Sequence, residues 1–368
     1  MHLTRRDFSR ITALGLASQL VPNLNAQAAP SERKIGYCII GLGRISDLFM
    51  AGIQSSPTSK VVALVSGHPE KAAQYAEKYG VPATSIYNYD NMHVIRNNPA
   101  IDAVYIGLPN SMHAEYTIRS AKAGKHVLCE KPMATTVPEA ESMIAACSSA
   151  GVKLMIAYRC HYETSHQRAV KLLRSGALGK VQVIQSAFGF NCGSSEWRLK
   201  KALAGGGPLF DVGIYCLNAC RYLTAEEPDH ISAFASSDPS DPRFREVEEN
   251  VTWTMKFPSG ALASCATTYG TQMDGYFRVY ASRGWLEISP AFGYDGLHLR
   301  AQYMPEAGPF VTLDEPNPEK SPYHFTLEAN HFSQCILKNR TPKSPGEEGL
   351  RDMRYIREIY RSAGIAMA

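Results

Sequence analysis

The feature of this sequence that most constrains its fold is a short apolar segment that runs directly into a glycine-rich turn. Residues 35–40 read Ile-Gly-Tyr-Cys-Ile-Ile, which predicts a buried strand, and the next six read Gly-Leu-Gly-Arg-Ile-Ser. A helix is predicted over 46–55 and a second strand over 60–65. This order of strand, turn, helix and strand indicates the first half of a doubly wound α/β domain.

The glycine-rich turn carries the residues that a dinucleotide phosphate needs. Gly41 permits the tight turn, Gly43 lets the backbone approach a pyrophosphate, and Ser46 is small enough for the helix to pack closely on the strand. The helix N-terminus, beside Arg44 and Ile45, then presents free amides to the phosphates. We therefore interpret this turn as part of a cofactor site. The alternative is a glycine-rich turn in some other α/β protein.

The end of the second strand indicates which dinucleotide is bound. Domains that bind NAD usually place Asp or Glu here, bonded to the ribose hydroxyls. This chain instead has Ser66, Gly67 and His68, followed by Lys71, so no carboxylate stands at the strand tip. A hydroxyl and a nearby ammonium suit a 2′-phosphate, which favours NADP over NAD. The alternative is that Lys71 lies on the solvated face of the following helix.

Strands and helices continue to alternate through the first part of the chain. Further strands are predicted over 100–106, 126–129 and 153–158, and helices over 115–123 and 134–149. Such alternation predicts a parallel sheet, and ligands bind beyond the carboxyl ends of its strands. The residues expected at that crevice are Leu108, Pro109, Asn110, His113, Glu130, Lys131 and Pro132.

The second part of the chain has a different rhythm. After a predicted helix over 165–175, extended segments are predicted over 181–190, 230–236, 250–257, 261–268, 276–281 and 284–289. They favour a large, mostly antiparallel sheet with one open face. A helical stretch from 205 to 222 interrupts them, and there Asp211 and Tyr215, four residues apart, project from one helix face. A last helix is expected over 346–363.

The first 28 residues do not belong to this fold. Arg5 and Arg6 precede a short apolar run, and Ala26-Gln27-Ala28 offers small residues for signal peptidase. This order predicts a signal peptide read by the twin-arginine export machinery, and so a periplasmic protein exported folded. The alternative is an accidental arginine pair on an amphipathic helix. No apolar run is long enough to anchor the chain in a membrane.

Charge and cysteine usage exclude several other classes. The net charge is +4, and no basic cluster is interleaved with aromatic residues, so nucleic acid is not an expected partner. Neither a CxxC pair nor an HExxH motif occurs, and we predict no metal site. We expect most of the nine cysteines to be buried small apolar residues. Cys216 and Cys220, four apart in a helix, are poorly placed to form a disulfide.

Several motifs together resemble the Gfo/Idh/MocA oxidoreductase family, and within it the glucose–fructose oxidoreductase subgroup, where a tyrosine stands at position 215. They span residues 35–350 and read GLGRIS, LVSG, LPNSMHAE, AGKHVLCEKPMAT, MIAYRCHY, EWRLKKALAGGGPLFDVGIY and SPGEEG. The resemblance implies a Rossmann domain over 29–158 and a substrate domain over 159–345. It also implies a final helix over 346–368 that packs back on the first domain, and a homo-oligomer formed through the open sheet.

The resemblance also assigns roles to individual residues. Lys131 matches the catalytic lysine of the Glu-Lys-Pro motif, Tyr215 the catalytic tyrosine and Asp211 its neighbour. The remaining matches are to cofactor positions: Ser66, Gly67, Lys71 and Tyr89 around the 2′-phosphate, Pro109, Asn110, His113 and Arg159 along the cofactor, and Trp197 and Arg198 in a cofactor- or substrate-side segment. One departure is that only about six residues separate the predicted cleavage site from the first strand, where the subgroup has a long proline-rich arm over the cofactor.

The same residues make chemical sense for sugar oxidation. When a hydride leaves a sugar carbon, a proton must leave its hydroxyl, and a tyrosine at its ordinary pKa near 10 is a poor base. We expect the Lys131 ammonium to favour the Tyr215 phenolate, and Asp211 to orient or share the proton. The alternatives are a surface lysine, a core tyrosine and a helix-capping carboxylate.

These expectations lead to one main reading of function and two others. The first is an enzyme that oxidises an aldose at C1 to the lactone and passes the hydride to a second sugar through one tightly bound NADP. An export route supports it, because a periplasm has no ready pool of NADP. The second is an ordinary NADP-dependent aldose dehydrogenase or sugar reductase with exchangeable cofactor. The third is a sugar-binding protein that has lost redox activity.

Overall fold

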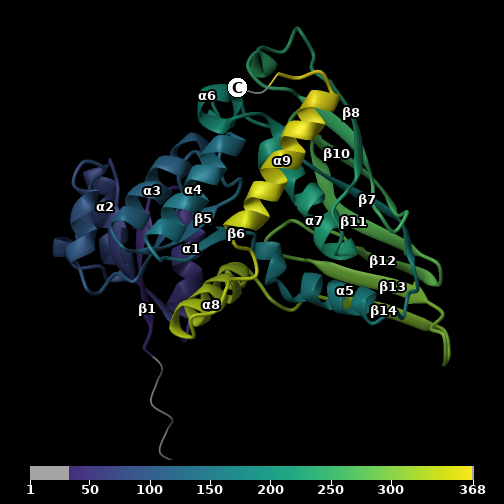
Figure 1. Ribbon diagram of the computed structural model, residues 1–368, viewed down its shortest axis with the longest axis horizontal. Coiled ribbons are helices and arrows are strands. Elements are labelled where there is room, and N and C mark those ends of the chain that lie inside the picture. Colours follow the sequence, from purple (N-terminus) through teal and green to yellow (C-terminus); the bar gives the residue numbers. More distant parts are fainter. Residues whose placement is uncertain (1–32, 367–368) are drawn as a thin grey trace, which may run out of the picture. The chain divides into compact units, whose positions relative to one another are not determined.

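A six-stranded parallel sheet forms the first half of the computed structural model, which describes residues 33–366 (Figure 1). The strand order is β3-β2-β1-β4-β5-β6, with every neighbouring pair parallel. The strands are β1 (Ile35–Ile40), β2 (Ser59–Val65), β3 (Ile86–Tyr87), β4 (Ala103–Ile106), β5 (His126–Glu130) and β6 (Leu154–Ala157). All six residues of β1 are buried, as expected where helices cover both faces of a sheet.

The helices that follow these strands are fixed by local signals. They are α1 (Arg44–Gln54), α2 (Pro69–Tyr79), α3 (His113–Lys122) and α4 (Val137–Ser149). Thr136 caps α4 in a capping box with Glu139, and Gly80 ends α2 in the left-handed conformation, with φ of 68°. The predicted doubly wound half is confirmed.

An eight-stranded sheet forms the second half. Its order is β14-β13-β12-β11-β7-β10-β9-β8, and all neighbours are antiparallel except β7 and β10, which pair in parallel. The strands are β7 (Val181–Gly189), β8 (His230–Ser236), β9 (Asn250–Lys256), β10 (Leu262–Thr268), β11 (Met273–Ala281), β12 (Gly284–Ile288), β13 (His298–Tyr303) and β14 (Val311–Pro316). The predicted fold class, a Rossmann-type sheet plus a mostly antiparallel one, is confirmed.

One face of the second sheet packs on helices and the other is open. In β9, Val251, Trp253 and Met255 point into the core while the residues between them are exposed. The helices on the covered face are α5 (Thr164–Arg174) and α7 (Ile214–Thr224), with α6 (Lys201–Ala204) in the connection before α7. The open face exposes Phe234 and Leu262, at 77% and 52%.

Two long helices near the C-terminus connect the halves. Helix α8 (Tyr323–Leu337) packs against α1, and α9 (Gly346–Ser362) packs against α4 and β6 on one side and against α7 and β8 on the other. Figure 1 shows α9, in yellow, running obliquely between α4 and the strands of the second sheet. The predicted domain boundaries at 158 and 345 remain predictions.

Several sequence expectations meet simple outcomes here. All nine cysteines are buried and free, as expected. Strands β3, β13 and β14 and helix α8 were not predicted. No helix among residues 33–366 has the length and apolar character of a membrane span. The predicted signal peptide, residues 1–28, lies outside the described residues.

Candidate active site

The turn between β1 and α1 has room for a phosphate. Gly41 has a φ of +84°, and a Cβ there would lie 2.6 Å from the Leu108 side chain, so only glycine fits. A Cβ on Gly43 would meet nothing closer than 3.9 Å, which leaves the backbone open to a ligand. Gly43 is the N-cap of α1 and makes no side-chain cap, so the first amides of α1, beside Arg44 and Ile45, receive no capping side chain. These residues fit a dinucleotide pyrophosphate.

The tip of β2 brings together three of the residues expected around a 2′-phosphate. Ser66 Oγ accepts a 3.1 Å hydrogen bond from the His68 amide. The Tyr89 ring lies against Gly67, where a Cβ would come within 2.9 Å of the ring. Lys71 lies in the first turn of α2, with its ammonium 5.8 Å from the Tyr75 ring centroid rather than on Ser66 or Tyr89. Ser66 is buried at this tip, Gly67 and His68 are exposed, and no carboxylate stands among these three residues.

His113 joins two of the loops that follow the parallel strands. Its ring is buried, with Nδ1 2.8 Å from the Pro132 carbonyl and Nε2 2.9 Å from the Leu108 carbonyl. Burial lowers the pKa of His113, although both carbonyl contacts oppose that shift. His113 therefore fixes the loop after β4, which includes Pro109, against the loop after β5.

Asn110 connects this crevice to the second half of the chain. Its side-chain amide donates a 2.8 Å hydrogen bond to the carbonyl of Ala204, at the end of α6. Trp197 and Arg198 lie in the short helical turn before α6, with the guanidinium 4.9 Å from the Trp197 ring centroid. The 197–204 segment therefore borders the crevice, beside the loop that carries Asn110.

Glu130, the last residue of β5, and Lys131, which follows it, make contacts in different parts of the chain. The Glu130 carboxylate is buried and accepts a 2.7 Å hydrogen bond from the Tyr105 hydroxyl. Burial raises the pKa of Glu130, and the charge of Lys131 opposes that rise. The Lys131 ammonium instead reaches the second half of the chain. It donates to the Asp211 carbonyl at 2.7 Å and to its carboxylate at 3.3 Å. Glu130 thus anchors the strand end from which Lys131 extends.

Asp211 is held by three donors. Besides Lys131, Arg198 Nε donates to its Oδ2 at 2.8 Å and the Tyr269 hydroxyl donates at 2.9 Å. Burial works to raise the pKa of Asp211, but Lys131 and then Arg198 lower it below its ordinary value. Asp211 lies in a π-helical turn, Leu209–Gly213, that leads into α7, and it makes no helix cap. It is therefore an ionised carboxylate that orients Lys131.

Tyr215 lies in the first turn of α7, next to two cations. The Lys131 ammonium is 4.6 Å from its ring centroid and the Arg159 guanidinium is 5.4 Å from it. Burial raises the pKa of Tyr215, and Arg159 is the group that most opposes the rise. This differs from the expectation that Lys131 would bring the phenol into working range: Lys131 is bonded to Asp211, and Arg159, although farther from the ring, is the group that most lowers the pKa of Tyr215.

Arg159 itself is held rigidly by residues that the sequence did not single out. Its guanidinium donates to the carbonyls of Phe292 at 2.5 Å and Gly293 at 3.0 Å, and it stacks 4.5 Å from the Tyr294 ring centroid. Tyr294 and Tyr269 were both missed. Each follows a predicted strand without a motif, and only the fold brings them to the crevice.

The crevice cluster, defined here as Lys131, Asp211, Tyr215, Arg198 and Tyr269, stands at the carboxyl edge of a parallel sheet next to a phosphate-binding turn. An ammonium and a phenol at that edge can move a proton beside a nicotinamide ring. Fold and site together define a nicotinamide-dependent oxidoreductase.

Comparison with known proteins identifies the family to which the chain belongs. Residues 35–158 match the oxidoreductase family with the NAD-binding Rossmann fold, and residues 166–287 match the Gfo/Idh/MocA C-terminal domain. The chain belongs to the Gfo/Idh/MocA oxidoreductase family. It is 32% identical to a D-xylose 1-dehydrogenase (NADP+) of Haloferax volcanii over 83% of this chain and 90% of that one.

Two further similarities concern function and structure. A D-xylose 1-dehydrogenase [NADP+] of Haloarcula marismortui is 29% identical, covering 90% of this chain and 92% of its own. The crystal structure of an aldose–aldose oxidoreductase from Caulobacter crescentus, complexed with glycerol, is 46% identical with a TM-score of 0.85. That match covers 90% of this chain and 98% of that one.

Proposed function

We propose that this protein oxidises an aldose at C1 to the lactone with NADP, and then reduces a second sugar with the hydride it has stored. The observation that carries the proposal is the crevice cluster, in which Lys131 and Tyr215 stand together at the predicted nicotinamide site. The similarity to an aldose–aldose oxidoreductase at 46% identity supports sugars as both donor and acceptor.

The choice of NADP rests on the tip of β2. Gly67 and His68 are exposed there, Ser66 is buried and Tyr89 is half-buried; none of them is a carboxylate, and Lys71 lies in the first turn of α2. A carboxylate there would repel a 2′-phosphate, so its absence favours NADP. The two xylose dehydrogenases to which the chain is similar are named for NADP.

The residues of the crevice have different roles in the proposed reaction. Bound NADP supplies a hydride acceptor, and the turn at Gly41–Ser46 would hold its phosphates. Tyr215 exchanges a proton with the sugar hydroxyl. The positive charges of Arg159 and Lys131 favour its phenolate when it gives up the proton, and its raised pKa keeps it protonated, so that it holds a proton for the reduction of a second sugar. Asp211 keeps Lys131 aimed at this point.

A tightly held cofactor distinguishes this proposal from an ordinary sugar dehydrogenase. The test is to purify the mature chain without added nucleotide, denature it, and record the absorbance and mass of any small molecule released. Near-stoichiometric NADP supports a cofactor that is reset in place by a second sugar. Protein that is free of nucleotide but active when NADP is supplied would support the exchangeable alternative.

The proposed compartment is the periplasm, reached through the twin-arginine route. Arg5→Lys combined with Arg6→Lys should leave the precursor in the cytoplasm, because the arginine pair is read by a receptor rather than as charge. Cell fractionation measures this. A double variant that reaches the periplasm at normal yield would contradict the proposal.

We also propose a homo-oligomer formed through the open face of the second sheet. That face carries the exposed Phe234, Leu262 and Val183, three of the large apolar side chains exposed among residues 33–366. Phe234→Lys should shift the protein toward monomer in light scattering. An unchanged mass would exclude this face as the interface.

A further inference from the structure

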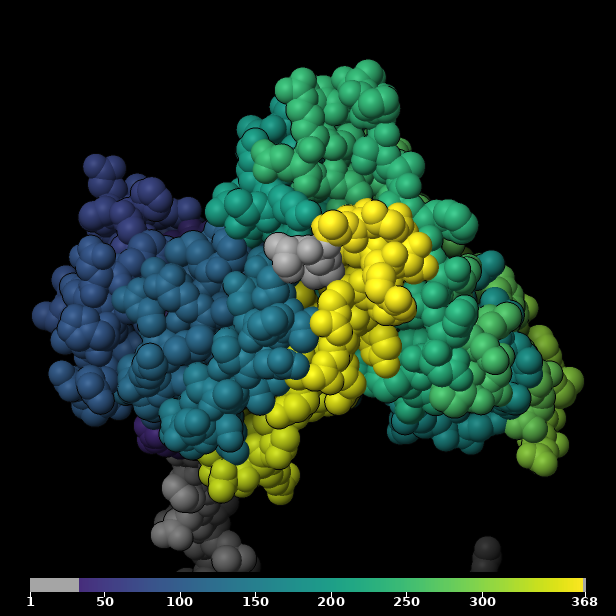
Figure 2. All heavy atoms as spheres, turned by 45° about the horizontal axis from the view of Figure 1, so that its top comes forward, coloured from purple at the N-terminus to yellow at the C-terminus, as the bar shows by residue number. Residues whose placement is uncertain are grey.

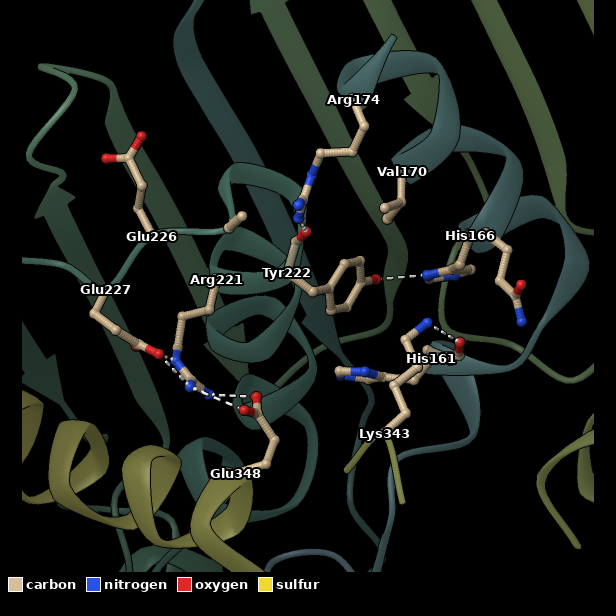
Figure 3. A pocket seen from close by; sticks show the side chains of 13 residues that line it. His161, His166, Val170, Arg174, Arg221, Tyr222, Glu226, Glu227, Lys343 and Glu348 are labelled. Atoms are coloured by element: carbon tan, nitrogen blue, oxygen red, sulfur yellow. Dashed lines mark hydrogen bonds and ion pairs between the residues drawn. The ribbon is translucent and has the colours of Figure 1, made fainter. Parts of the chain in front are cut away.

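A second cavity lies on the far half of α7, away from the crevice cluster (Figure 3). Its volume is about 250 Å³, and it is bounded by α5, by the last turns of α7 and by the segment that precedes α9. None of the five residues of the crevice cluster lines it. At slightly below the roughly 300–1,000 Å³ of most ligand sites, it suits a small molecule.

The carboxylates that line this cavity already have partners. Arg221 bonds Glu227 at 2.6 Å and Glu348 at 2.8 Å, and Glu226 accepts a 2.8 Å hydrogen bond from the Ser259 amide. Figure 3 shows Glu226 and Glu227 on one side of the cavity and Lys343 and His166 on the other. The acidic side of the cavity is therefore largely satisfied within the protein.

The other two cations that line the cavity bond backbone carbonyls rather than carboxylates. Arg174 donates to the carbonyl of Tyr222 at 2.9 Å, and Lys343 donates to the carbonyl of His161 at 2.8 Å. Within residues 33–366, neither forms an ion pair with a carboxylate. Burial lowers the pKa of Lys343, and the charge of Arg174 lowers it further. Two like charges therefore face one cavity, and an anion between them would relieve their repulsion.

Other groups in the cavity are suited to hydroxyls. The Tyr222 hydroxyl lies 2.5 Å from His166 Nδ1. Gln167 also lines the cavity; its Nε2 donates a 3.0 Å hydrogen bond to the Tyr162 carbonyl, which leaves its second N–H and its side-chain oxygen for a ligand. The Glu226 carboxylate adds acceptors on the opposite side. Glu226 and Glu227 would repel a doubly charged phosphate more than a single carboxylate. The lining thus favours a monoanion that also carries hydroxyl groups.

We propose that this cavity binds a sugar acid, a monocarboxylate with several hydroxyls, whose carboxylate lies between Arg174 and Lys343. The identity of the ligand rests on the proposed function. Oxidation of an aldose at C1 yields a lactone, and water then opens the ester bond to give the aldonate and a proton. The enzyme would thus bind the hydrolysed form of its own product at a second site.

Isothermal titration calorimetry of sodium gluconate into the cofactor-loaded mature protein tests the proposal. Gluconate should bind, and Arg174→Met and Lys343→Met should each weaken binding about tenfold or more, as expected for loss of a charged hydrogen bond. Lys171→Met is the matched control, because Lys171 lies on α5 outside the cavity and should leave binding unchanged. Glucitol, which has the hydroxyls without the carboxylate, should bind at least tenfold more weakly.

Three results would overturn the proposal. The first is equal gluconate affinity in wild type and in the Arg174→Met/Lys343→Met double variant. The second is loss of binding in Lys131→Met, which would place gluconate in the crevice. The third is inorganic phosphate binding as tightly as gluconate with the same sensitivity to variants, which would indicate a general anion site. Heats of binding need no turnover, so these results can be read whether or not the enzyme oxidises aldoses.

Discussion

The two ends of helix α7 hold two groups of charged residues that differ in how far their side chains are exposed to solvent. At its start, the crevice cluster is partly open: the side chains of Lys131, Asp211 and Arg198 are 11%, 19% and 32% exposed. Farther along, Arg221 is 3% exposed and bonds Asp352, which is fully buried. We call this second group, with Asn218, Glu348 and His161, the α7–α9 network.

The difference separates residues that hold the fold from residues that are available for chemistry. In the α7–α9 network the carboxylate of Asp352 also accepts from Tyr158 and Asn218, so its bonds are made within the protein. In the crevice cluster the Tyr215 ring lies beside the Lys131 and Arg159 cations, and we propose that its hydroxyl bonds a sugar. Helix α7 thus connects the predicted nicotinamide site to the contact between α7 and α9. Figure 2 shows α9, in yellow, on the surface of the molecule.

The largest expected effect falls on Tyr215. Tyr215→Phe removes the proton-exchanging hydroxyl and keeps the ring, so turnover should fall by about 10²–10⁴-fold with the fold and bound cofactor retained. Tyr222→Phe, on the same helix, should stay within about threefold of wild type, well below that range. Steady-state kinetics of both variants measure the difference. Similar losses in the two variants would remove the distinction between the helix ends.

Arg221→Leu should break the α7–α9 network. It leaves the buried Asp352 without its cation, so the free energy of unfolding should drop by about 3–5 kcal/mol. Arg198→Leu is the counterpart at the crevice, where Asp211 keeps Lys131 and Tyr269; it should cost about 1 kcal/mol but lower turnover. Urea denaturation and kinetics of both variants test the contrast. An Arg198→Leu variant as unstable as Arg221→Leu would contradict it.

His161 should make the network sensitive to acid. Burial lowers the pKa of His161 to about 4, below the ordinary 6.5, although Asn218 opposes the shift. Its contribution is therefore fully present above pH 6.5 and lost as pH falls toward 4, because the unfolded chain takes up the proton first. The loss is about 3 kcal/mol. His161→Gln should flatten the stability profile in this window, and His93→Gln, at an exposed site, should not.

The smallest expected effect is at the tip of β2. Ser66→Asp should weaken NADP binding about fivefold to tenfold by repelling the 2′-phosphate, since the neighbouring Gly67 and His68 are exposed and water there screens a new charge. Ser66→Asn is the uncharged control of the same size and should change affinity less. Titration of both nucleotides into protein freed of cofactor measures this. Unchanged NADP affinity in Ser66→Asp would remove the basis for choosing NADP.

The sequence predicts the first sheet well because its signals are local. Five of its six strands are short apolar runs, and Thr136 and Gly80 mark a helix start and a helix end; the two-residue β3 is too short to give such a signal. Helix α8 was missed because His324 and Glu328 are buried beside Phe325 and so interrupt its apolar pattern. The edge strand β14 was missed because Val311 and Leu313 are its only two apolar residues before Asp314, Glu315 and Pro316.

In the candidate site too, residues that belong to a local motif were predicted, and residues that only the fold brings together were not. Lys131 was identified from a motif, and Asp211 and Tyr215 also from their helical spacing. Tyr269 was not, because it bonds Asp211 from 58 residues away along the chain. The α7–α9 network joins Arg221 to residues more than a hundred positions later, and no local pattern predicts such a pair.

The central claim is that the crevice cluster carries out one proton exchange beside a cofactor that stays bound. Stopped-flow mixing of the cofactor-loaded enzyme with an aldose, followed by a second sugar, tests it most directly. The account predicts one NADPH formed per chain, retained through a desalting column and oxidised only when the second sugar is added, with both steps slowed in Tyr215→Phe. NADPH that leaves the protein before the second sugar arrives, or unaltered rates in Tyr215→Phe, would contradict it.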